Sequence, residues 1–197
     1  MQTMIEAGEV DALVPERVWQ ELAKGLMENT PSLMIEALRK CGALKKILPE
    51  IDALFGIPQR IESHPEVDAG IHTLMVMDQA AKLNLSLPER FAALTHDLGK
   101  ALTPDNILPG HANHEQRGLI PLEALCQRLK ISKECHDLAK IVMKAHGSIH
   151  NGLHLDSHSI LQLLIHCDAI RRPTRFQEIL NVCLCDHLGR LGFENTP

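Results

Sequence analysis

Hydrophobic residues recur at helical spacing along most of the chain, and no stretch sustains the alternation that is typical of a strand. In the first sixty residues, Pro15 and Pro31 suit the first turn of a helix, and Gly42 suits a position just past a helix end. These signals predict three or four short helices before a seam near Ile57-Pro58.

The remaining pattern predicts longer helices separated by turn residues. We expect them at about 68–83, from Pro88 to Gly99, and at about 115–130, 133–146, 157–170 and 173–188. Between them, the segment "ALTPDNILPGHANH" holds two prolines, one glycine and two asparagines, which indicate an irregular loop. The fold class that follows is all-α.

Composition limits the classes of function. The 197 residues are 45% hydrophobic, enough for the core of one domain or of one domain with a helical extension. A net charge of −5 gives no general attraction for nucleic acid, so any RNA contact must be local. One Trp, four Phe and no Tyr argue against a surface that binds single strands by base stacking.

Cysteine usage and hydropathy predict a cytoplasmic protein without membrane contact. The six cysteines include no CxxC pair, and no secretory leader or membrane-length apolar run is present. We interpret them as reduced core residues. The spacing of Cys183 and Cys185 does not match a zinc site.

Two His-Asp pairs differ in their surroundings. His96-Asp97, in "THDLGK", is followed by Gly99, where the helix can end and the chain can turn away. His136-Asp137 lies inside a continuing helical pattern and is interpreted as an ordinary polar helix face. The second pair therefore serves as a control for the first.

Other polar residues interrupt or closely follow apolar helices in the same way: His72, His146 and Asp168. One histidine beside an apolar face is usually a hydrogen-bonded core residue, but several in one small helical chain favour a shared site. Imidazole and carboxylate ligands together suit a divalent ion such as Mn, Fe, Ni, Mg or Zn.

The order His72, His96-Asp97, Asp168 resembles the H…HD…D signature of HD-domain metal-dependent phosphohydrolases, over about residues 65–170. Segments such as "LTHDLGKALTP", "GHANHEQRG" and "LLIHCDAIRRPTRF", with the upstream helices, resemble the C-terminal part of bacterial CCA-adding tRNA nucleotidyltransferases. The resemblance implies an HD helical bundle at 61–190, preceded at 1–60 by helices of the neck and body of those enzymes. The sequence looks like a C-terminal fragment of such an enzyme.

The resemblance also implies ligands and activities. The metal ligands it implies are His72, His96, Asp97 and Asp168, with His114 (or His111) and His146 as additional ligands for a second ion. The implied cofactor is a divalent metal (Ni, Mg, Mn or Co), and the implied activities are those of a phosphatase, a 2′-nucleotidase and a 2′,3′-cyclic phosphodiesterase. The implied partners are nucleotides with 2′,3′-cyclic or 2′ phosphates and, in the full-length protein, the tRNA 3′ end. Nucleotide addition is not expected, since the chain contains no Gly-Gly dipeptide.

Chemical reasoning assigns further roles. A bound divalent ion activates water and neutralises phosphoryl charge, and Lys100 beside it could bind a substrate phosphate. The expected catalytic residues are His96, Asp97, Lys100 and His146, and the expected substrate-binding residues are Arg171, Arg172 and Arg175, which could reach a phosphate or the tRNA backbone. The alternative is a non-catalytic body that positions tRNA for a nucleotidyltransferase.

Overall fold

A computed structural model describes residues 12–193 of the chain, and this part is helical, with a single isolated bridge between Pro58 and Asp68. In chain order the elements are α2 (Pro15–Leu26), α3 (Ser32–Lys40), α4 (Leu44–Ile47), α5 (Pro49–Asp52), α6 (Ala69–Lys82), α7 (Leu87–Thr95), the 3₁₀ turn η2 (Leu98–Leu102), α8 (His114–Arg117), α9 (Leu119–Leu129), α10 (Lys133–His150), the 3₁₀ turn η3 (Gly152–His154), α11 (Ser157–His166) and α12 (Pro173–Leu188). The all-α prediction is confirmed.

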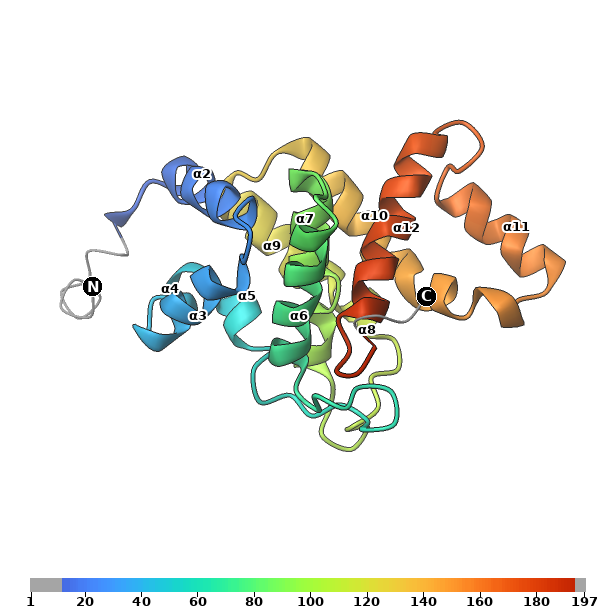
Figure 1. Cartoon of the computed structure of the whole chain (residues 1–197), viewed down its shortest axis with the longest axis horizontal. Coiled ribbons are helices and arrows are strands. Elements are labelled where there is room, and N and C mark those ends of the chain that lie inside the picture. Colours follow the sequence, from blue (N-terminus) through green and yellow to red (C-terminus); the bar gives the residue numbers. More distant parts are fainter. Residues whose placement is uncertain (1–11, 194–197) are drawn as a thin grey trace.

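Helix α7 lies at the centre of the molecule, with α6, α10 and α12 packed against it (Figure 1). Its start is fixed by a capping box between Ser86 and Glu89, with Pro88 in the first turn. Every residue from Glu89 to Thr95 is buried, because neighbouring helices cover all of its faces. A helix enclosed in this way holds the residues that follow it at the middle of the fold.

The N-terminal helices share the same hydrophobic core. Trp19 of α2 packs edge-on against Phe91 of α7, with ring centroids 5.5 Å apart. The buried Arg90 guanidinium donates hydrogen bonds of 2.8 Å to the carbonyl oxygens of Leu26 and Glu28, which satisfies the C-terminal end of α2. A division into segments 1–60 and 61–190 stays a prediction, since one core joins the two parts.

The end of α7 differs from the sequence-based expectation. The helix stops at Thr95 rather than at Gly99, and η2 follows after Asp97. A Cβ on Gly99 would collide with the carbonyl oxygen of His114 and lie 2.6 Å from the amide nitrogen of Gly118. Gly99 is therefore required for close packing of η2 on α8.

Two further expectations concern the whole of the described chain. Five of the six cysteines are buried, as predicted, whereas Cys41 is half-buried and lies outside the core. Among residues 12–193, none of the helices combines the length and the hydrophobicity that crossing a bilayer requires.

Candidate metal centre

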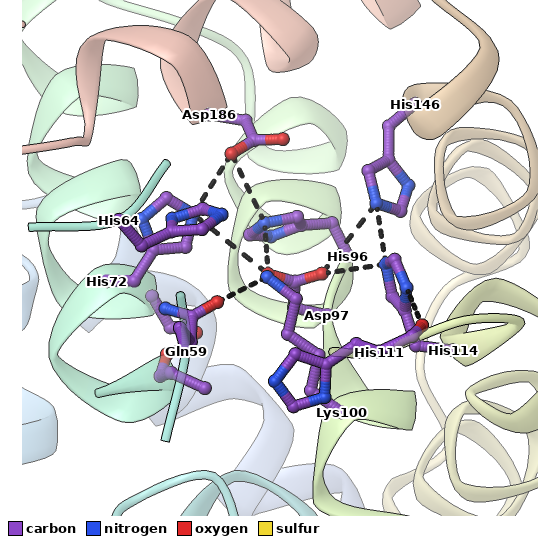
Figure 2. Close-up of polar contacts among 12 residues, drawn as sticks. Gln59, His64, His72, His96, Asp97, Lys100, His111, His114, His146 and Asp186 are labelled. Atoms are coloured by element: carbon purple, nitrogen blue, oxygen red, sulfur yellow. Dashed lines mark hydrogen bonds and ion pairs between the residues drawn. The ribbon is translucent and has the colours of Figure 1, made fainter. Parts of the chain in front are cut away.

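Five helical elements direct side chains into one buried polar cluster (Figure 2). The members are His72 of α6, His96 and Asp97 from the junction of α7 and η2, His114 of α8, His146 of α10 and Asp186 of α12. All are buried except His114, whose side chain is 14% exposed. The sequence separation from His72 to Asp186 means that only the folded chain assembles the cluster.

Local structure fixes the first two histidines. The Asp68 carboxylate caps α6 by accepting from the amide of Ile71, so His72 lies in the first turn on the buried side of the helix. His96 is the C-cap residue of α7 and follows directly from its last turn. Both positions depend on how their helices begin or end.

Three imidazoles are held in the tautomer that a metal ligand needs. Nδ1 of His96 donates to the Ala93 carbonyl at 2.8 Å, and Nδ1 of His114 donates to the His111 carbonyl at 2.9 Å. Nδ1 of His146 faces the carbonyls of Val142 and Met143, each at 3.1 Å. Since a carbonyl only accepts, Nδ1 carries the hydrogen in each ring, and Nε2 carries the lone pair in the neutral form. The Nε2 atoms of His114 and His146 face each other at 3.1 Å.

Asp97 stands between two groups of ligands. Its Oδ2 lies 3.1 Å from Nε2 of His96 and 4.0 Å from Nε2 of His72. Its Oδ1 lies 3.2 Å from Nε2 of His114 and 3.7 Å from Nε2 of His146. The one carboxylate therefore presents a different oxygen to each pair of histidines.

These contacts divide the cluster into two sets of three ligands. His72, His96 and Asp186 form one set, and Asp97, His114 and His146 form the other, with all the ligand atoms of each set within 4.8 Å of one another. The buried Nε2 of His96 and Oδ1 of Asp97 have no hydrogen-bond partner among the described residues. Such unsatisfied buried atoms are costly, and an ion held by each set would satisfy the one that belongs to it.

Asp186 was not predicted from the sequence. Its Oδ1 lies 2.9 Å from Nε2 of His72 and 3.8 Å from Nε2 of His96, and its Oδ2 pairs with Nε2 of His150 at 2.6 Å. A signal was present in the helical pattern of α12. Asp186 follows Ile179, Val182 and Cys183 at helical spacing and occupies the same buried stripe, where a carboxylate needs a partner.

The expectation that Asp168 is a metal ligand is corrected by the structure. Asp168 adopts a left-handed backbone conformation, φ 53°, where the chain leaves α11. Its carboxylate pairs with Arg171 at 2.7 Å and with Arg172 at 3.4 Å, and it belongs to no ligand group among residues 12–193. Asp168 follows the end of α11 and pairs with arginines of the turn after it, and the carboxylate that lies beside His72 and His96 is that of Asp186.

The three arginines expected to bind substrate lie near Asp168. Arg171 and Arg172 pair with its carboxylate, and Arg175 donates to the main-chain oxygen of Asp137 at 3.4 Å. These residues are at the start of α12, whereas Asp186 is thirteen residues beyond Pro173, about 20 Å along a helix. The structure therefore does not bring the arginines to the cluster.

The other sequence candidates have separate positions. Nδ1 of His111 contacts the Thr103 hydroxyl at 2.8 Å and Nε2 contacts the Pro58 carbonyl at 3.0 Å, so this ring supports the loop and is not in either ligand set. The control pair lies on α10, where His136 is 3.0 Å from Glu123 and Asp137 is 2.9 Å from Lys133. These ordinary ion pairs agree with the interpretation of a polar helix face.

Electrostatics favour charged groups in this buried place. Burial alone would raise the pKa of the Asp97 carboxyl, but His96 and Lys100 hold it well below its ordinary value, and the Lys100 ammonium is 2.6 Å away. Burial alone would lower the pKa of His96, but Asp97 and then Asp186 outweigh it and raise the pKa to about 9. Burial alone would also raise the pKa of Asp186, but hydrogen bonds with His150 and His72 hold it well below its ordinary value. At neutral pH both carboxylates are therefore ionised and His96 carries a proton, which a bound divalent ion would replace.

The donor set fits a divalent ion. Imidazole nitrogens and carboxylate oxygens are present in both sets, and no cysteine takes part among the described residues. His72, His96 and Asp186 would hold one ion, and Asp97, His114 and His146 would hold a second.

Comparisons with known proteins agree with this geometry. Residues 1–55 match the family described as "Probable RNA and SrmB- binding site of polymerase A", and residues 69–181 match the HD domain family. Over all 197 residues the chain is 57% identical to a multifunctional CCA protein of Dechloromonas aromatica and to one of Burkholderia mallei, and 54% identical to one of Burkholderia vietnamiensis. The chain spans about half the length of these relatives, 48% in each case. Because the HD match covers more than half of the sequence and includes His72, His96, Asp97, His114 and His146, the chain belongs to the HD domain family.

Proposed function

We propose that this chain is a metal-dependent phosphohydrolase that acts on nucleotides with 2′,3′-cyclic or 2′ phosphates, within a protein of tRNA CCA addition and repair. The observation that carries the proposal is the presence of two ligand sets side by side: His96 belongs to one set, and the adjacent Asp97 belongs to the other. Two adjacent divalent ions are a recurrent arrangement in phosphate-ester hydrolysis. The similarity to multifunctional CCA proteins supports the context of tRNA.

When bound, divalent ions supply a water nucleophile at neutral pH and offset negative charge on the phosphoryl oxygens. The chain orients the ligands through the backbone hydrogen bonds to His96, His114 and His146. His150 and His72 hold the Asp186 carboxylate from two sides. Ligands fixed in this way need little reorganisation when substrate binds.

Lys100 would contact the reacting phosphate. Its ammonium has three donors, and two of them are engaged, with Oδ2 of Asp97 and with Oε1 of Gln59. The third is available to a phosphate oxygen, because Lys100 also lines an open pocket beside the cluster. Lys100 would therefore link the substrate to the ligand carboxylate.

A hydrolysis panel tests the proposal. Nucleosides carrying 2′,3′-cyclic, 2′, 3′ or 5′ phosphates are incubated with the purified chain and Ni, Mn, Mg or Co, with and without a chelator. We expect metal-dependent release of product from the cyclic and 2′ substrates, lost in His72→Ala and His96→Ala. No hydrolysis with any metal would refute the proposed activity.

A second function, RNA binding by the N-terminal helices, is favoured by the family match at residues 1–55. In that case the N-terminal helices bind tRNA, and the hydrolase site acts on the 3′ end of the bound tRNA. If the chain binds tRNA but retains no divalent ion after incubation with each metal, the tRNA-positioning function alone remains.

A further inference from the structure

A pocket of about 400 Å³ opens beside the metal cluster. It is lined by the segment that precedes α6, with Gln59, Arg60 and Ser63, and by the loop before α8. Lys100 and His114 line it and also contact Asp97. A ligand in this pocket would therefore touch the edge of the cluster.

The charge of the pocket favours an anion. Lys100 and Arg60 both line it, and its lining includes no Asp or Glu. The charge of Lys100 is offset by Asp97, 2.6 Å away. Within the described part of the chain, the exposed Arg60 guanidinium forms no ion pair, and it offers several N–H donors in one plane.

Gln59 adds a buried donor without a partner. Its side chain is 2% exposed, and its Oε1 accepts from the Lys100 ammonium, which can only donate. The amide nitrogen consequently faces away from Lys100, and no hydrogen-bond partner for it exists among residues 12–193. A buried donor left unpaired costs free energy, and Gln59 bears this cost while its Oε1 holds the Lys100 ammonium beside the pocket.

The outer wall is apolar and held in place. Ile107, Pro109 and Ala112 line it, and the His111 ring beside them is fixed at both nitrogens. Arg60 Nη2 would be 3.2 Å from a Cβ on Gly110, so the guanidinium lies close to this loop. A cation next to an apolar wall suits a sugar or base that carries a phosphate.

We propose that this pocket binds the terminal nucleotide of the substrate and that Arg60 binds its 5′-phosphate. The proposal rests on the proposed phosphohydrolase function, because the metal cluster and Lys100 then receive the 2′ or 2′,3′-cyclic phosphate. Arg60, on the separate and exposed wall, meets a second phosphate. The substrate class that follows is a nucleotide with phosphate on both sides of the ribose, as at the end of an RNA strand, in preference to a nucleoside with a free 5′-hydroxyl.

Two matched substrates test the assignment: adenosine 2′,3′-cyclic phosphate with and without a 5′-phosphate. For the unchanged chain we expect the 5′-phosphate to lower KM at least tenfold, with kcat changed less than twofold. Arg60→Gln should remove this preference, so that the KM values of the two substrates lie within twofold of each other in that variant. Arg17→Gln, a control at an exposed arginine on α2, should retain the preference. Equal KM values for the two substrates in the unchanged chain, or an undiminished preference in Arg60→Gln, would overturn the assignment.

Calorimetry with adenosine 5′-monophosphate separates this proposal from the hydrolase proposal. If the unchanged chain binds this nucleotide, Arg60→Gln weakens binding at least tenfold, and no substrate is hydrolysed, the subsite stands and the proposed activity fails. If substrates are hydrolysed but the nucleotide binds both variants equally, the activity stands and the subsite is wrong. Circular dichroism melting of each variant confirms that it is folded.

Discussion

At the scale of single residues, the candidate ligands differ from the other polar side chains in their hydrogen-bond and ion-pair partners. His96 and Asp97 each retain a buried ligand atom without a hydrogen bond, whereas Asp168 has Arg171 and Arg172. The sequence was enough to single out His96-Asp97, because the two residues and Gly99 lie next to one another along the chain. It concealed the choice between Asp168 and Asp186, since both follow apolar stretches, and only packing shows which carboxylate is enclosed.

The first prediction concerns this choice of carboxylate. Asp186→Asn should lower metal-dependent hydrolysis by about 10- to 100-fold, because an amide is a weaker ligand and also disturbs the orientation of His72 and His150. Asp168→Asn removes only exposed ion pairs and should retain activity and bound metal. Initial rates and metal content measured on both variants decide between them. The reverse ranking would restore Asp168 as the ligand.

The second prediction compares the two His-Asp pairs. The His96→Ala, Asp97→Ala double variant should bind no stoichiometric divalent ion, because it removes one ligand from each of the two sets. The His136→Ala, Asp137→Ala double variant loses two surface ion pairs and should bind metal as the unchanged chain does. Metal is measured by elemental analysis after dialysis. Equal loss in the two variants would show that the first pair is not special.

At the scale of elements, hydrophobic spacing predicted the helices well because amphipathic packing is local in sequence. The expected helix at about 68–83 and the observed α6, Ala69–Lys82, differ by one residue at each end. The end of α7 was less accessible to this reasoning. That end depends on how η2 packs against α8. The hydrophobic periodicity of either segment alone does not predict this contact, because the two segments are apart in sequence.

The third prediction tests that contact. Gly99→Ala should destabilise the fold by about 1–3 kcal/mol or more, because the added methyl group meets the backbone of α8, which cannot rotate away. It should also reduce metal binding, since α8 carries His114. Gly152→Ala is the matched control: no atom lies within 4 Å of its added Cβ, so its effect should stay within about 0.5 kcal/mol. Urea unfolding curves give both values, and a Gly99→Ala curve equal to the control would remove the packing argument.

At the scale of the whole molecule, the cluster joins elements that are distant in sequence. Ligands come from α6, the α7–η2 junction, α8, α10 and α12, while α2 and α3 support α7 and α6 from the other side. The family resemblance predicted that these segments belong together. The physical reason is that the buried carboxylates Asp97 and Asp186 can be tolerated only where several helices bring imidazoles or a cation to them.

The last prediction follows from this assembly. A divalent ion bound by the folded chain is not held by the same ligands after unfolding, so binding should raise the free energy of unfolding. At a free metal concentration of 100 times Kd the gain is about 2.7 kcal/mol, less any binding to histidines of the unfolded chain. For a chain of this length that corresponds to roughly 5–10 °C in Tm. Calorimetric scans with metal and with a chelator should differ by this amount for the unchanged chain and should coincide for the His96→Ala, Asp97→Ala variant, because that variant lacks a ligand in each set. A chain whose Tm does not respond to Ni, Mn, Mg or Co would contradict a site that binds metal across five helical elements.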